Sequence, residues 1–284
     1  MIYDTPDAWN QATAKRISLF GMSGLGKTHI SQILRGSGDW FHFSIDYRIG
    51  TGYLGEHIND NLKRHAMRQP FLAQLLRTDS IYIGPNMTFE NLSPLSTFLG
   101  QPGATSKGGL PFEEYARRQE LHHRAEVNAL LDTPHFIERA REIYGYDNFV
   151  CDTGGSICEV VDPDNPEDQV MATLAANTLP VWIEGTPDHV ETLVARFAKA
   201  PKPMCYRPEF LNAKWETHGG DDVDPNEFAT ATYRDAITAR HPRYAAMARN
   251  WGITVQAVDV ATVRDASDVM ALISEGIGKA ARKA

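Results

Sequence analysis

Short apolar runs alternate along the whole chain with longer stretches in which apolar residues recur three and four positions apart. The short runs predict buried strands, and the longer stretches predict amphipathic helices. Strands that alternate with helices are typical of an α/β fold with a mostly parallel sheet and helices on both faces. In such sheets a ligand binds beyond the carboxyl ends of the strands. The five runs that predict strands lie at about 15–20, 40–45, 148–152, 179–183 and 253–258.

Weaker patterns between these runs give further expectations. Thr133 is expected to cap a helix, because Thr-Pro is a frequent helix start. Residues 81–83 are compatible with a short strand, since they are apolar and β-branched or aromatic. The stretch 200–226 is rich in Pro, Gly and Asp and predicts a loop. It is followed by two predicted helices, near 227–239 and 242–250.

The most specific motif follows the first run. Gly21, four further residues and then Gly26-Lys27-Thr28 fit the pattern G-x-x-x-x-G-K-[ST] between a predicted strand and a predicted helix. Glycines let backbone N–H groups approach phosphate oxygens, and the following helix adds its positive dipole end. Lys27 supplies a charge for the β- and γ-phosphates, and the Thr28 hydroxyl is a hard oxygen ligand for Mg²⁺. The alternative interpretation is a glycine-rich turn with a surface lysine.

The motif therefore predicts a site for a nucleoside triphosphate, taken to be ATP, together with Mg²⁺. Lys27 is expected to lie on an open loop rather than in the core. The residues expected to contact the nucleotide in this segment are Gly21, Ser23, Gly24, Leu25, Gly26, Lys27, Thr28 and His29.

Asp152 is the second candidate for chemistry, because it ends the apolar run Asn148–Asp152. A strand that ends in a carboxylate after a phosphate-binding loop is the Walker B arrangement, in which the carboxylate holds Mg²⁺ directly or through water. Thr28 and Asp152 are thus the predicted metal residues. The alternative is an aspartate that forms the turn before Thr153-Gly154-Gly155.

Composition narrows the classes of partner. The chain of 284 residues carries 28 Lys and Arg against 36 Asp and Glu, a net charge of −8, which argues against nucleic acid as a partner. No window approaches the length of an apolar membrane span, and the first residues lack a basic-then-apolar signal pattern. Three cysteines suggest free thiols in a reducing cytoplasm. His122-His123, on a polar helix, is expected to face solvent.

At this point the chain resembles the P-loop kinases of small metabolites, most closely the shikimate kinase and gluconate kinase group. The phosphate loop and the carboxylate Asp46 at the end of the second strand match that group. Thr153-Gly154-Gly155 is similar to its T-G-G-G substrate loop. An inward Arg196, followed by Lys202-Pro203-Met204, looks like the start of its lid. Arg240-His241-Pro242-Arg243-Tyr244 is similar to its R-x-P-L-Y segment.

The chain also departs from that group. Ser44 stands where shikimate kinases have the first Asp of Asp-x-Asp, and Asp152 stands where they have Ala. The metal-binding carboxylate is therefore expected on the third strand. The segments 50–145 and 198–240 are much longer than in shikimate kinases. These are the regions that bind and cover the acceptor, so the resemblance supports phosphoryl transfer and does not support shikimate as substrate.

The resemblance implies roles for the remaining candidates. Asp46 would accept the proton of an acceptor hydroxyl, and Arg196, Lys199 and Lys202 would neutralise charge on the transferring group. Lys27, Asp46, Asp152 and Arg196 are the predicted catalytic residues. For each arginine the alternative is a structural salt bridge. The residues expected to recognise the acceptor are Asp46, Arg48, Arg117, Gly154, Gly155 and Arg240.

We expect a single P-loop kinase-like domain over 1–284, with a helical acceptor-binding insertion at 50–145 and a lid-like insertion at 198–240. The predicted activity is ATP- and Mg²⁺-dependent phosphoryl transfer to a hydroxyl of a small, anionic metabolite, without a nucleic-acid or membrane partner. Two alternatives stay open. One is an ATPase or nucleotide switch whose insertions bind a protein partner. The other is a kinase that acts on a hydroxyl linked to a macromolecule.

Overall fold

The computed structural model describes residues 2–282 of the chain, which form two compact units. Within the described residues, the first unit comprises 2–45, 130–201 and 230–282, and the second comprises Asp46–Ala129 and Lys202–Ala229. Among the described residues, no helix has the length and apolar character needed to cross a membrane.

A five-stranded sheet forms the centre of the first unit. Its order is β2-β3-β1-β4-β5, and every adjacent pair of strands is parallel. Most strand side chains are buried, as expected when helices cover both faces of a sheet. The predicted α/β fold class is therefore confirmed. The strands are β1 (Arg16–Phe20), β2 (Trp40–Ser44), β3 (Asn148–Asp152), β4 (Leu179–Glu184) and β5 (Ile253–Gln256).

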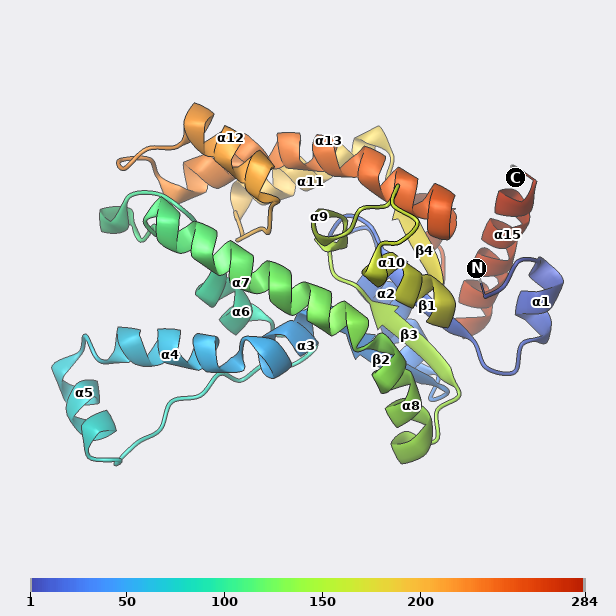
Figure 1. Cartoon of the computed structure of the whole chain (residues 1–284), viewed down its shortest axis with the longest axis horizontal. Helices are drawn as coiled ribbons and strands as arrows, with labels where there is room; N and C mark the ends of the chain where they lie inside the picture. Colours follow the sequence, from blue (N-terminus) through green and yellow to red (C-terminus); the bar gives the residue numbers. More distant parts are fainter. Residues whose placement is uncertain (1, 283–284) are drawn as a thin grey trace. The chain divides into compact units, whose positions relative to one another are not determined.

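Two layers of helices cover this sheet. Helices α2 and α15 pack on each other and on strands, and α8 and α10 do the same on the other face (Figure 1). Apolar residues at helical spacing supply the contacts: Ile30 and Leu34 of α2, four positions apart, are both buried. The helices whose residues lie in the first unit are α1 (Pro6–Gln11), α2 (Lys27–Gly36), α8 (Thr133–Tyr144), α9 (Ile157–Val160), α10 (Gln169–Asn177), α11 (Pro187–Lys199), α14 (Ala257–Val260) and α15 (Ala266–Ala281).

The second unit is helical and contributes no strand to the sheet within the described residues. A π-helical turn at Ile49–Tyr53 and a 3-10 turn at Thr105–Lys107 join its helices. Its helices are α4 (Gly55–Ala66), α5 (Pro70–Arg77), α6 (Ser93–Leu99) and α12 (Pro208–His218). Three further helices have residues in both units: α3 (Ile45–Arg48), α7 (Phe112–Leu131) and α13 (Pro225–Trp251).

Several local predictions were wrong. Residues 81–83 form no strand, and Thr133 is the first residue of α8 rather than its cap. The two helices predicted near 227–239 and 242–250 are one helix, α13, with Pro242 inside it. Proline removes one N–H from the helix and leaves one carbonyl, that of Thr238, without its helical donor. Pro242 and Thr238 are both exposed, so water can hydrate that carbonyl.

The stretch predicted as a loop at 200–226 contains helix α12. Trp215, one of its aromatic residues, has partners outside this stretch: its ring stacks on Phe112 at 4.7 Å and meets the Phe228 ring edge-on at 5.4 Å. A short sequence window contains none of these partners, so the composition of 200–226 alone suggested a loop.

The residues just before α12 are fixed to α7. The carbonyl of Met204 accepts hydrogen bonds from Tyr115 Oη and Gln119 Nε2, each at 3.0 Å. The backbone N–H of Tyr206 donates to Gln119 Oε1 at 2.9 Å. Three hydrogen bonds thus hold the beginning of the segment that was predicted to act as a lid.

His122 does not face solvent, contrary to the prediction. It is 2% exposed, and its Nδ1 lies 3.1 Å from the Cys205 thiol and 3.5 Å from Glu126 Oε2. Burial lowers the pKa of His122 from its ordinary 6.5 to about 4, and the neighbouring His123 adds to the effect. A pKa this far below 7 means that the imidazole is neutral at pH 7.

This buried imidazole predicts how stability changes with pH. Between about pH 6.5 and about 4 the unfolded chain binds more protons than the folded chain, so stability falls as the pH is lowered through that window. The loss amounts to at most about 3 kcal/mol. We expect His122→Gln to flatten the slope of unfolding free energy against pH in urea denaturation, and His123→Gln to leave it largely unchanged. An unaltered slope in His122→Gln would contradict the assignment.

Candidate functional site

The glycine-rich loop connects β1 to α2 at the carboxyl end of the central strand. Its glycines have positive φ values: 134° at Gly21, 89° at Gly24 and 108° at Gly26. A Cβ at Gly21 would lie 2.7 Å from the Ile183 carbonyl, and one at Gly26 would lie 2.5 Å from Val260 Cγ1. Both the backbone angles and the lack of space require glycine here. The loop is thus fixed by the strand and turn beside it.

Lys27 lies where this loop ends and α2 begins. It is the first residue of α2 and is only 6% exposed, so the expectation of an open position was wrong. Its ammonium donates to the carbonyls of Gly21 at 2.8 Å and Met22 at 3.1 Å. These two hydrogen bonds hold the Lys27 ammonium against the loop whose backbone N–H groups the motif assigns to phosphate binding.

Thr28 and Asp152, the two predicted metal residues, are in contact. The Thr28 hydroxyl donates to Asp152 Oδ2 at 3.2 Å, and the other oxygen, Oδ1, accepts from the Gly154 N–H at 3.2 Å. β1 and β3 are adjacent in the sheet, which brings the end of β3 beside the loop that leaves β1. The sheet order therefore places a hydroxyl and a carboxylate, both hard oxygen ligands, beside the lysine.

The glycine segment after β3 also reaches the loop. Thr153 Oγ1 donates to the Leu19 carbonyl at 2.9 Å, and Gly154 has a φ of 74°. Gly155 lies so close to Ser23 that a Cβ at residue 155 would collide with the Ser23 hydroxyl. Of the two predicted acceptor-binding glycines, Gly155 thus borders the phosphate loop.

Arg196 and Lys199 are exposed residues of α11. Thr186 and His189 form a capping box at the start of this helix, which fixes its direction. A Cβ built on Gly24 would lie 3.6 Å from the Arg196 guanidinium, so this side chain reaches the loop. Lys199 is the last residue of the helix.

His29 and Arg240, two further predicted site residues, make hydrogen bonds to groups outside the phosphate loop. His29 Nε2 lies 3.2 Å from the Val263 carbonyl, in the segment that follows β5 and α14. Arg240 is 4% exposed, and its Nε donates to Glu159 Oε1 at 2.6 Å. Glu159 was not predicted; a carboxylate within the apolar run Ile157–Val160 was the signal available in the sequence.

The remaining candidates belong to the second unit. Asp46 and Arg48 lie on α3, and the Arg48 guanidinium sits 5.0 Å from the centre of the Tyr53 ring. Arg117 is exposed and pairs with Glu114 through two hydrogen bonds of 2.8 and 2.9 Å. These bonds are the largest cause of the lowered pKa of Glu114, about 2. Lys202 is exposed.

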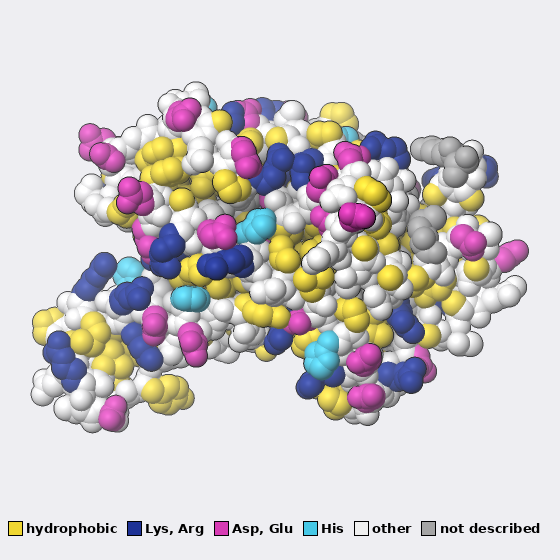
Figure 2. All heavy atoms as spheres, in the orientation of Figure 1, with side chains coloured by type: hydrophobic (Ala, Val, Ile, Leu, Met, Phe, Trp, Pro, Cys, Tyr) yellow, Lys and Arg dark blue, Asp and Glu magenta, His cyan; other side chains and the backbone are white. Residues whose placement is uncertain are grey.

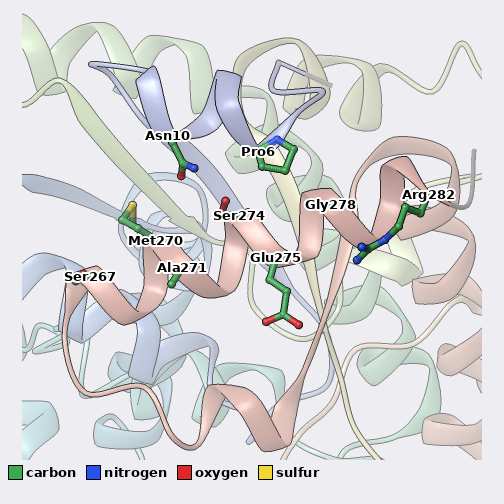
Figure 3. A pocket seen from close by; sticks show the side chains of 9 residues that line it. All are labelled: Pro6, Asn10, Ser267, Met270, Ala271, Ser274, Glu275, Gly278 and Arg282. Carbon is green, nitrogen blue, oxygen red and sulfur yellow. The ribbon is translucent and has the colours of Figure 1, made fainter.

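The first unit also has a groove of about 590 Å³ between α1 and α15, lined by residues along most of the length of α15 (Figure 3). It contains none of the residues predicted for the phosphate or metal sites. One of its side chains, Glu275, pairs with Lys279 at 2.8 Å. The residues that line it are Pro6, Asn10, Ser267, Met270, Ala271, Ser274, Glu275, Gly278 and Arg282.

Comparison with known proteins assigns no family to the chain. No family model matches the chain, and no curated protein does. A crystal structure of shikimate kinase from Bacteroides thetaiotaomicron is similar at 15% identity and a TM-score of 0.36, covering 95% of this chain and 96% of that one. Similarity at this level supports no argument about this chain. The parallel 2-3-1-4-5 sheet with its glycine loop is itself typical of P-loop NTPases.

The geometry of the loop predicts that glycine is required at residue 26. Alanine there would meet Val260 and would hold a φ of 108°, a left-handed strain on the order of 1–2 kcal/mol. We expect Gly26→Ala to abolish binding of a Mg²⁺–ATP analogue in calorimetric titration. Gly38→Ala is the matched control, because Gly38 also has a positive φ, 85°, but open space around it. Retained binding in Gly26→Ala would contradict the loop assignment.

Proposed function

We propose that the chain is an ATP- and Mg²⁺-dependent phosphotransferase that acts on a hydroxyl of a small, anionic metabolite. The observation that carries the proposal is the convergence of Lys27, Thr28 and Asp152, with the Thr28 hydroxyl 3.2 Å from the Asp152 carboxylate. One cation and two oxygen ligands then stand beside a glycine loop that tolerates no side chain at Gly21 or Gly26.

The residues present fit a Mg²⁺-bound triphosphate. Mg²⁺ prefers oxygen ligands and is usually held by one or two protein groups, with phosphates and water completing its shell. Thr28 and Asp152 supply such oxygens. Within 2–282, no group of three or more His, Cys, Asp or Glu residues could hold a metal by itself. Bound Mg²⁺ would neutralise charge on the phosphates.

The chain's own residues would position the reactants and neutralise the remaining charge during phosphoryl transfer. The loop N–H groups, Lys27 and Arg196 would bind the phosphate oxygens and stabilise charge on the transferring group. Asp46 would accept the proton of the acceptor hydroxyl or hold that hydroxyl in line. Arg48, Arg117, Gly154 and Gly155 would recognise the acceptor. Lys199 and Lys202, with the insertions 50–145 and 198–240, would close over it.

One observation favours a second candidate, an ATPase or nucleotide switch with a protein partner. The 61–78 segment of α4 and α5 has four exposed cations, Lys63, Arg64, Arg68 and Arg77, and no acidic residue. Phe71 and Tyr82 nearby are 71% and 92% exposed. In Figure 2, cationic and hydrophobic side chains gather over these two helices. Exposed apolar side chains that gather in one patch are typical of a protein-interaction surface, and the cations beside them would suit an acidic partner.

Lys27→Ala tests the phosphate-loop assignment. Loss of a cation that stabilises charge on the transferring group should lower ATP turnover on the order of 10²–10³-fold. The measurement is phosphate transfer or release from ATP at saturating Mg²⁺. Lys279→Ala, on the exposed face of α15, is the control and should keep full turnover. Turnover of Lys27→Ala within threefold of the parent would refute the assignment.

Replacing Asp152 and replacing Asp46 should have different effects on turnover. Asp152→Asn should shift the Mg²⁺ requirement to much higher concentration, because it removes charge beside Thr28. Asp46→Asn should bind Mg²⁺ and ATP normally and lose only transfer to the acceptor. Mg²⁺ titrations of turnover and of analogue binding separate the two effects. An equally raised Mg²⁺ requirement in both variants would assign both carboxylates to the metal.

A further inference from the structure

Three side chains from one turn of α13 bond to the backbone just after β3. Arg240, Arg243 and Tyr244 all lie in the segment Arg-His-Pro-Arg-Tyr, and their partners lie between residues 155 and 161. Arg243 donates to the carbonyls of Cys158 at 2.6 Å and Val161 at 2.5 Å. The other two side chains converge instead on a single atom.

That atom is the carbonyl oxygen of Gly155. Arg240 donates to it through one guanidinium nitrogen at 3.1 Å, and the Tyr244 hydroxyl donates to it at 2.7 Å. Burial raises the pKa of Tyr244 well above 10, so the hydroxyl keeps its proton and remains a donor. Both lone pairs of this carbonyl are therefore engaged, which fixes the orientation of the peptide.

Glu159 completes the arrangement. Its carboxylate accepts from Arg240 Nε at 2.6 Å, and the two side chains are 7% and 4% exposed. A buried guanidinium needs such a partner, and moving Arg240 to another ligand would leave Glu159 buried without this cation. We call Glu159, Arg240 and Tyr244 the Gly155 anchor.

The anchor acts on a stretch that touches the phosphate loop. Thr153 is fixed on the other side by its hydrogen bond to the Leu19 carbonyl. Gly154, with its φ of 74°, spans the two fixed points, and Gly155 lies against Ser23. A shift of the Gly155 peptide would therefore move backbone groups at the edge of the phosphate site.

We propose that the Gly155 anchor positions Gly154 and Gly155 for phosphoryl transfer, and that Arg240 acts through this backbone rather than on the acceptor. The proposal rests on the proposed function. Phosphoryl transfer depends on position, and small displacements of the groups around the transferring phosphate are costly in rate. Glu159, Arg240 and Tyr244 are positioning residues in this scheme.

Tyr244→Phe is the sharpest test, because it removes one hydrogen bond to Gly155 and keeps the ring. We expect kcat for Mg²⁺–ATP turnover to fall about tenfold. The dissociation constant of a non-hydrolysable Mg²⁺–ATP analogue should stay within twofold, since Gly21–Thr28 is untouched. Hydrogen exchange of the backbone amides at 153–157 should become faster. Arg240→Lys, which keeps the charge facing Glu159, should lower kcat at least as far.

Arg243→Met is the matched control, because it removes two hydrogen bonds from the same turn without touching Gly155. It should leave kcat within twofold at a temperature where all variants are folded. Equal losses of kcat in Tyr244→Phe and Arg243→Met would show a structural role only and overturn the proposal, as would unchanged kcat in Tyr244→Phe. A parent protein without turnover would instead contradict the proposed function itself.

Discussion

The candidate site depends on the hydrogen bond between the Thr28 hydroxyl and the Asp152 carboxylate, which joins two segments of the first unit. This bond links the first turn of α2 to the end of β3, next to the lysine that the loop carbonyls hold. Parallel pairing of β1 with β3 is what makes this contact possible, since it brings two strand ends to one edge of the sheet. Gly21, Gly26 and Gly155 then have room for backbone but not for side chains.

Three buried charged side chains restrict the conformations that the candidate site can adopt. Lys27, Arg240 and Glu159 are all buried in the first unit, and each has a partner at hydrogen-bond distance. Burying a charge is expensive unless it is paired and hydrogen-bonded, so these side chains have few alternative positions. The two cations serve different groups: Lys27 lies among loop carbonyls, whereas Arg240 joins a carboxylate and the Gly155 carbonyl. Their burial restricts how the loop and the glycine segment can move.

The sequence was sufficient for the sheet and the phosphate loop, because both depend on local signals. Strand runs, glycine spacing and the Lys-Thr pair are contained in short windows. It was insufficient where a contact spans distant residues. Trp215 of helix α12 packs against Phe112 and Phe228, and the buried His122 contacts Cys205. Arg240 was recognised as a special arginine, but its partner Glu159 is 81 positions away and no spacing rule connects the two.

The fate of the γ-phosphate tests the central account most directly. The protein would be incubated with Mg²⁺ and ATP carrying ¹⁸O in its γ-phosphate, together with a pool of small hydroxylated acids, sugars and nucleosides, and the products separated by mass spectrometry. The account predicts the labelled phosphoryl group in an organic phosphate ester that does not form without protein. Label found in inorganic phosphate alone would contradict phosphoryl transfer to a small molecule, and unconsumed ATP would contradict the nucleotide site.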